Sequence, residues 1–159
     1  MEGFFILIME ELKLISEITV SYFPPVKPSH RSVINSSQDA FTALSAFFNE
    51  DTLQLQEQFV ILYLNRTNRV IGGYRLSQGG ITGTVADIRL ILSVALKAVA
   101  TGVILGHNHP SGNLQPSRQD IELTGKIKQA AELMDIKVLD HLIISSEGNF
   151  LSIADEGLL

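Results

Sequence analysis

Two histidines and an aspartate have the types and spacing of metal ligands. His107 and His109 follow the apolar run 103–105, which reads as a strand. Alternate side chains of extended backbone lie on one face, so the two imidazoles can converge on one cation. Asp120 falls in the first turn of the next expected helix, where side chains lean back toward the helix start. Two nitrogens and one oxygen leave a fourth tetrahedral position for a water molecule, as in a catalytic zinc site.

The pair Ser117 and Asp120 also has an ordinary structural interpretation. A serine followed three residues later by an acid is typical of a helix N-terminus, where the hydroxyl accepts a backbone N–H and the acid suits the helix dipole. Taken alone, that interpretation is the stronger one. The His-x-His pair upstream favours a metal site, because the combination is rare by chance in a chain with only four histidines.

Composition narrows the class of protein. The chain has 159 residues, 45% of them apolar and 18% charged, which suits one domain with one core. It has no cysteine, which excludes disulfides, thiolate metal sites and the cysteine-ligated zinc deaminases. A net charge of −5 disfavours non-specific attraction to nucleic acid. The apolar run 3–9 is far shorter than the roughly 20 residues of a membrane span and has no basic start, so we expect a cytoplasmic protein.

The pattern of elements predicts an α/β fold with a mixed sheet. Residues 1–35 contain several prolines and are expected to form an extended N-terminal arm, followed by a single domain over 36–159. Gly102 is expected to end the helix that Asp87 caps, the second helix of the chain. The expected elements of the domain are a helix from Ser36 or Ser37 to Phe48, strands at 59–64, 70–76 and 81–85, a helix capped by Asp87, a strand at 103–105, a helix over 117–134, and strands at 136–145 and 150–153.

The motif residues resemble a known family of metal-dependent hydrolases. His107-x-His109-Pro110, then six residues, then Ser117-x-x-Asp120 matches the metal motif of JAMM (MPN, JAB-type) metalloproteases. The fuller string 107–112, with Pro116 before Ser117 and with 139–141 (Leu-Asp-His), resembles the bacterial RadC family from about residue 36 to the end. The resemblance implies a three-layer fold, a mixed β-sheet flanked by helices, of the JAB/MPN, cytidine-deaminase-like architecture. One departure is Ile88, where many relatives have proline.

The resemblance also implies roles for individual residues. His107, His109 and Asp120 would bind Zn²⁺, although a His₂Asp site also suits other divalent ions. Ser117 would orient the water or stabilise the oxyanion, and Glu57, just before the strand at 59–64, would be the general base. Spacing alone does not single out Glu57, since an acid at the edge of a strand is usually solvent-facing. The implied reaction is hydrolysis of a peptide or isopeptide bond.

Two further positions have open interpretations. Asp140 and His141 lie within an apolar strand; they either support a metal ligand or form a hydrogen-bonded polar pair in the sheet, and the second is slightly favoured. Asn108 should face away from the metal, and we expect no catalytic role for it.

Two functions other than hydrolysis are also compatible with the sequence. MPN-type domains also serve as non-catalytic interaction modules, and the RadC family name implies a role in DNA repair. The helix-hairpin-helix region of longer family members is not visible here, and the acidity disfavours direct DNA binding. The expected partner is therefore a peptide or protein substrate, with no membrane association and a possible homo-oligomer.

Overall fold

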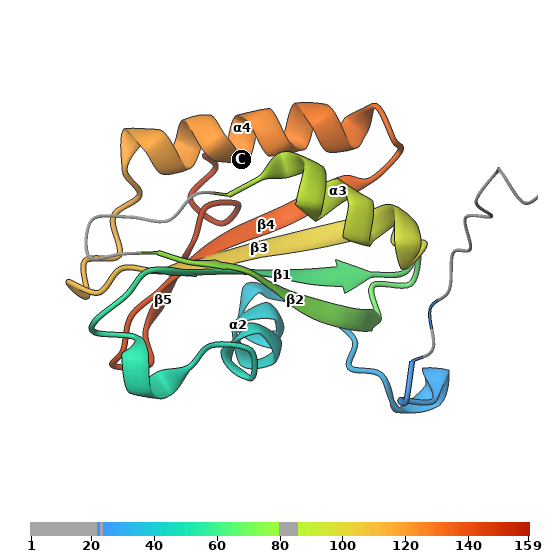
Figure 1. Cartoon of the computed structure of the whole chain (residues 1–159), viewed down its shortest axis with the longest axis horizontal. Coiled ribbons are helices and arrows are strands. Elements are labelled where there is room, and N and C mark those ends of the chain that lie inside the picture. Colours follow the sequence, from blue (N-terminus) through green and yellow to red (C-terminus); the bar gives the residue numbers. More distant parts are fainter. Residues whose placement is uncertain (1–21, 23, 80–85) are drawn as a thin grey trace, which may run out of the picture.

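A five-stranded mixed sheet lies at the centre of the part of the chain that the structure describes (Figure 1). The computed structural model describes residues 22, 24–79 and 86–159. The strand order is β2-β1-β3-β4-β5; β3 and β4 are parallel and the other neighbours antiparallel. The elements are η1 (Pro28–His30), α2 (Ser37–Ser45), η2 (Glu50–Thr52), β1 (Gln58–Leu64), β2 (Val70–Gln78), α3 (Ile88–Lys97), β3 (Gly102–Asn108), α4 (Arg118–Glu132), β4 (Lys137–Ile144) and β5 (Phe150–Ser152).

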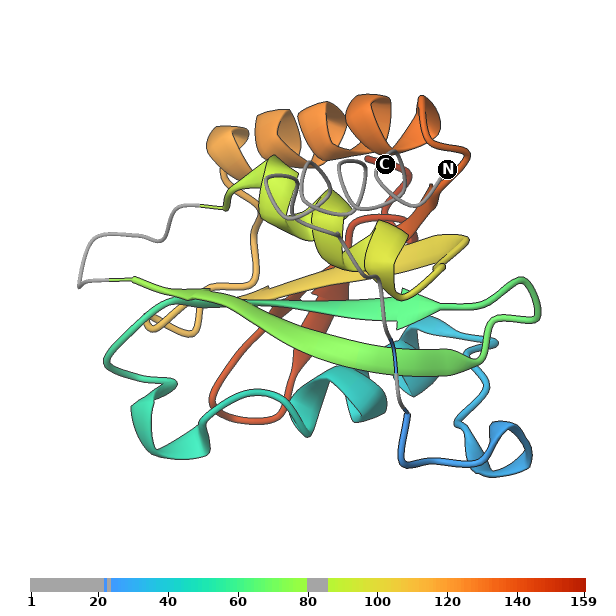
Figure 2. The same cartoon turned by 45° about the vertical axis from the view of Figure 1, so that its right-hand side comes forward.

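Helices cover both faces of the sheet, which gives three layers. In both views α3 and α4 lie on one side and α2 on the other (Figures 1 and 2). Every residue of β1 and β3 is buried, as expected for strands packed on both faces. The structure therefore confirms the expected three-layer α/β fold.

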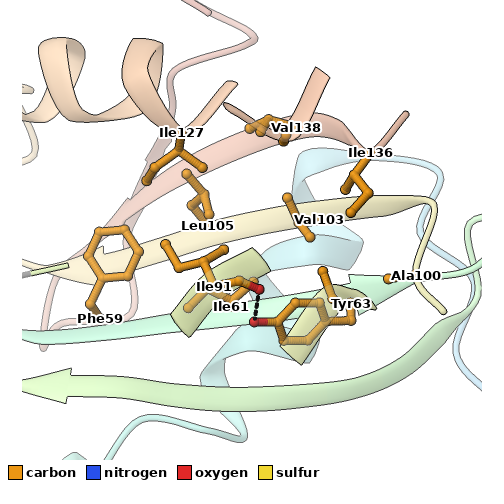
Figure 3. Close-up of a cluster of buried hydrophobic side chains, with 12 residues drawn as sticks. Phe59, Ile61, Tyr63, Ile91, Ala100, Val103, Leu105, Ile127, Ile136 and Val138 are labelled. Carbon is orange, nitrogen blue, oxygen red and sulfur yellow. Dashed lines mark hydrogen bonds between the residues drawn. The ribbon is translucent and has the colours of Figure 1, made fainter. Parts of the chain in front are cut away.

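Strand alternation divides the core into two clusters. Phe59, Ile61 and Tyr63 of β1 belong to the cluster under α3 and α4, whereas Val60 and Leu62 belong to the cluster under α2. Figure 3 shows the first cluster, where the Tyr63 hydroxyl donates a hydrogen bond of 3.1 Å to the carbonyl oxygen of Ile91. The face of the sheet under α3 and α4 is also the face that carries the candidate site.

Helix α2 approaches the sheet closely at one glycine. A Cβ atom added to Gly106 would lie 2.9 Å from Cδ1 of the buried Leu44. A residue without a side chain is therefore needed at this point of β3 for α2 to pack as it does.

The connection from β3 to β4 sets the position of the site. These two strands are parallel, so the chain leaves the carboxyl end of β3, passes through α4 and returns to the opposite end of the sheet. The start of α4 thus lies near the residues that end β3. This topology allows an aspartate in the first turn of α4 to meet histidines at the end of β3.

The expected elements of the described region are present, with shifted ends. The helix expected to reach Phe48 ends at Ser45, and Phe48 packs in the core after it. The expected arm includes the short 3-10 turn η1, and Val33 forms a bridge with Arg69. The expected strand at 81–85 and the apolar run 3–9 lie outside the described residues. No helix of the described chain is long and apolar enough to span a membrane.

The prediction that Gly102 ends the second helix is wrong. Helix α3 ends at Lys97, and Val99 has the left-handed φ of 55° that ends such helices. The N–H of Ala100 then bonds to the carbonyl oxygen of Ala95, the closing bond of a Schellman turn. Gly102 instead opens β3, and a β-branched residue, Val99, takes the position at which a glycine was expected. At the other end, α3 begins at Ile88 with Asp87 as its N-cap, as the sequence predicts.

Candidate metal centre

The carboxyl end of β3 presents two imidazoles on the face under α3 and α4. His107 is buried and pairs across the sheet with Phe59, whose ring stacks on the imidazole at a centroid distance of 5.9 Å. The hydrogen bonding to β4 continues one residue beyond the strand, where the N–H of His109 bonds to the carbonyl oxygen of Ile144. The Nε2 atoms of His107 and His109 consequently lie 2.9 Å apart.

Asp120 reaches the same point from the start of α4. Its Oδ1 lies 3.3 Å from Nε2 of His107, and its Oδ2 lies 3.5 Å from Nε2 of His109. The carboxylate is held in place by a capping box, in which the backbone N–H of Ser117 donates to Oδ2 at 2.6 Å and the Ser117 hydroxyl accepts from the Asp120 N–H. The structure thus brings together the three predicted ligands, and it gives Ser117 the capping role that the sequence also allowed.

A backbone carbonyl determines the tautomer of His109. The Nδ1 atom lies 2.6 Å from the carbonyl oxygen of Asn113, which can only accept a hydrogen bond. Nδ1 therefore carries the proton. In the neutral ring, Nε2 has a bare lone pair directed at Asp120 and His107.

A chain of three groups determines the tautomer of His107. The Thr124 hydroxyl donates to the carbonyl oxygen of Asp120, so it accepts from Nδ1 of His141, both at 2.6 Å. Burial lowers the pKa of His141 well below its usual value, so the ring is neutral and its Nε2 is an acceptor. That atom lies 2.7 Å from Nδ1 of His107, which must then donate. Nε2 of His107 is left with a bare lone pair, like that of His109.

The resulting donor set fits a divalent cation. Two bare imidazole nitrogens would repel each other at this separation unless a proton or a cation lay between them. Burial by itself raises the pKa of Asp120, but hydrogen bonds with His107 and His109, made when their Nε2 atoms carry protons, outweigh it and hold the pKa well below its usual value, so the group is anionic. Ligand bonds of about 2.0–2.1 Å at tetrahedral angles place ligand atoms about 3.3 Å apart, close to the observed spacings.

Glu57 lies beside this cluster. It directly precedes β1 and is two residues from Phe59, so alternation puts its side chain on the face that carries His107. The side chain is partly buried, and burial raises the pKa of its carboxyl group above the usual value. The charges of the two histidines lower that pKa and the charge of Asp120 raises it, which shows that all four groups share one electrostatic environment.

Two residues that support the site, His141 and Thr124, were less favoured or missed in the sequence analysis. His141 contacts the candidate ligand His107, which is the interpretation that the sequence favoured less. Asp140 forms a polar pair in the sheet, because it accepts a hydrogen bond from the Ser152 hydroxyl. Thr124 was missed, although its position one helical turn after Asp120 was a usable signal. Asn108 faces away from the cluster, as expected, and is bonded on the side of α2.

Comparison with known protein families shows which family the chain belongs to. The sequence profile of the RadC-like JAB domain matches residues 34–158. The chain belongs to the RadC family. Relatives in that family include UPF0758 proteins from Flavobacterium johnsoniae, 49% identical over 125 residues, and from Porphyromonas gingivalis, 41% identical over 136 residues. A third, from a Cyanothece species, is 40% identical over 127 residues.

These RadC relatives are longer than the region they share with the chain. The matches cover 79%, 86% and 80% of this chain but only 53%, 59% and 51% of the respective relatives. The chain therefore spans between half and three fifths of their length. Their names state no activity, so the chemistry of the RadC domain must be argued from the site.

Proposed function

We propose that this chain is a zinc-dependent hydrolase domain that cleaves a peptide or isopeptide bond. The observation that carries the proposal is the convergence of one carboxylate and two Nε2 atoms, each with a bare lone pair in the neutral ring, with Glu57 in the same electrostatic environment. A site that only stabilises the fold has no need of an open position and an adjacent acid. The amide substrate is supported by the resemblance of the motif to JAMM metalloproteases.

Each residue has a distinct role in the proposed reaction. His107, His109 and Asp120 hold the cation. A zinc ion bound there would supply Lewis-acid activation of a water molecule and polarisation of a carbonyl group. Glu57 takes a proton from the attacking water and delivers it to the leaving amine.

Burial suits Glu57 to this task, because a raised pKa makes its carboxylate a better proton acceptor than an exposed glutamate. Ser117 contributes in a second way beyond its cap. Its oxygen accepts from the N–H of Asp120, and its own hydroxyl proton can then donate to the developing oxyanion.

The test compares the zinc-loaded parent with Glu57→Gln on a panel of peptide and isopeptide substrates. We expect Glu57→Gln to bind zinc like the parent and to lose at least about 100-fold in kcat, the scale of general-base catalysis. The matched control is Glu50→Gln, an exposed glutamate in η2, which should retain the activity of the parent. A parent that binds zinc and cleaves none of the substrates would contradict the proposal and favour an interaction module.

A further inference from the structure

Asn108 lies between the two candidate histidine ligands in sequence but on the opposite face of β3. Its side chain is fully buried, and its polar atoms are satisfied by three hydrogen bonds. Oδ1 accepts from the backbone N–H of Gln58 at 2.7 Å. Nδ2 donates to the carbonyl oxygens of Leu53 at 2.7 Å and Gln56 at 3.0 Å. An acceptor facing one N–H and a donor facing two carbonyls fix the orientation of the amide.

Two of these three bonds bracket Glu57. The Asn108 side chain donates to the backbone carbonyl oxygen of the residue before Glu57 and accepts from the backbone N–H of the residue after it. The carbonyl oxygen of Glu57 itself accepts from the N–H of Gly79 at 2.8 Å. The backbone on both sides of Glu57 is thus fixed to β3, the strand that carries His107.

A different residue secures the start of the same loop. The Gln58 side chain accepts from the N–H of Asn49 and donates to the Asn49 carbonyl and to the hydroxyl of Thr52. The path from η2 to β1 is therefore held at two separate points. Gln58 fixes the part far from Glu57, and Asn108 fixes the part next to it.

We propose that Asn108 is a positioning residue that fixes the backbone of Glu57 relative to the metal-binding end of β3. The inference rests on the proposed role of Glu57 as general base. One strand would then set two elements of the site: alternate residues of β3 direct the imidazoles to one face, and the residue between them fastens the base from the other face. Only an asparagine-like amide offers one acceptor and two donors at this reach, since aspartate lacks the donors and leucine lacks all three bonds.

The kinetic test uses Asn108→Leu, which keeps the branched shape of the side chain and removes the three bonds. We expect kcat to fall about 10–100-fold, the scale of a small misplacement of a reacting group, with KM and zinc affinity within about threefold of the parent. The matched control is Gln58→Met, which removes the other anchor of the loop and should keep kcat within about threefold of the parent. In the Glu57→Gln background, Asn108→Leu should cause no further loss, because the residue it positions is already absent.

A second readout needs no substrate. In zinc-loaded protein, Asn108→Leu should speed hydrogen exchange of the Gln58 amide at least about tenfold, and a crystal structure should show Glu57 displaced while the cluster of His107, His109 and Asp120 superposes on the parent. If the parent cleaves nothing, the proposed function fails, but the placement of Glu57 still tests this inference.

Three results would overturn the proposal: an unchanged kcat in Asn108→Leu, an equal loss of kcat in Gln58→Met, or an undisplaced Glu57 in the variant. Should Asn108→Leu fail to fold, Asn108→Asp takes its place. It retains the acceptor for the Gln58 N–H and removes both donors, and it should show the same separation of kcat from zinc affinity.

Discussion

The proton on the His107 ring is placed by groups that do not belong to the cation site. Thr124 and His141 form a directed chain that ends at Nδ1 of His107 and leaves Nε2 bare. Such partners of a ligating histidine orient the ring and set its tautomer. We therefore expect His141 and Thr124 to contribute to the affinity of the proposed cation site, although neither is a candidate ligand.

Replacing His141 tests this chain. His141→Leu should weaken zinc binding about 10–100-fold, measured by competition with a chelator of known affinity, because His107 loses the acceptor that fixes its tautomer. His141→Gln is the matched variant, since its amide can accept from His107 and donate to Thr124, and it should restore part of the affinity. A folded His141→Leu protein with the zinc affinity of the parent would refute the role of the chain.

The protonation of His109 predicts how zinc affinity depends on pH. In the metal-free protein, the hydrogen bond with Asp120 raises the pKa of His109, so a proton occupies Nε2 up to a higher pH than in an ordinary histidine. Zinc must displace that proton. Affinity should therefore be highest above the raised pKa and should fall about tenfold per pH unit below it.

Zinc affinity measured at a series of pH values, beside an NMR titration of His109, checks this expectation. In Asp120→Asn the pKa of His109 should drop, because the charged partner is gone. An affinity that stays constant while His109 takes up its proton would show that His109 is not a ligand.

At the scale of elements, the N-terminus of α4 combines a helix cap with a candidate metal ligand. Ser117 and Asp120 satisfy each other's backbone groups, so the same box that starts the helix fixes the carboxylate. We expect Ser117→Ala to lower the free energy of unfolding by about 1 kcal/mol, measured by urea denaturation.

Ser117→Asn separates the two roles of this serine. Asparagine is also a good N-cap, so this variant should keep the stability of the parent. It lacks a hydroxyl, so its activity should fall if the Ser117 proton stabilises the oxyanion. Parent-like stability in Ser117→Ala would be inconsistent with the cap.

The packing of α2 on β3 depends on a missing side chain. Gly106→Ala should lower the free energy of unfolding by about 1–3 kcal/mol, because its Cβ would press on the buried Leu44. The control is Gly125→Ala within α4, where the added Cβ meets nothing within 4 Å and alanine favours the helix. That variant should be as stable as the parent or up to about 1 kcal/mol more stable. Equal effects of the two substitutions would contradict the packing described here.

Across the whole molecule, the parts of the site that follow local rules could be predicted from the sequence. Alternation along a strand placed His107 and His109 on one face, and the direction of side chains in a first helical turn brought Asp120 to them. Glu57 came from the family resemblance, because nothing local distinguishes it from other acids. The order of elements was enough for an α/β fold with a mixed sheet, and the family resemblance supplied the three layers.

The remaining features depend on long-range pairing. His141 reaches His107 because β4 pairs with β3 in one register, with Leu105 opposite His141, and no local pattern specifies that register. The anchoring of Glu57 by Asn108 depends on a loop that returns to β3 from about fifty residues away. The turn that follows α3 depends on Val99, whose unfavourable left-handed φ is sustained by the surrounding hydrogen bonds and not by its own preference.

We propose that His107, His109 and Asp120, supplied by two separate elements, hold one divalent cation. Anomalous diffraction at the zinc edge from crystals of the zinc-loaded protein can locate that ion. We expect a single strong peak about 2.0–2.2 Å from Nε2 of both histidines and from a carboxylate oxygen of Asp120. The absence of a peak among these three side chains, or a zinc ion bound elsewhere with the cluster unoccupied, would rule out this cation site.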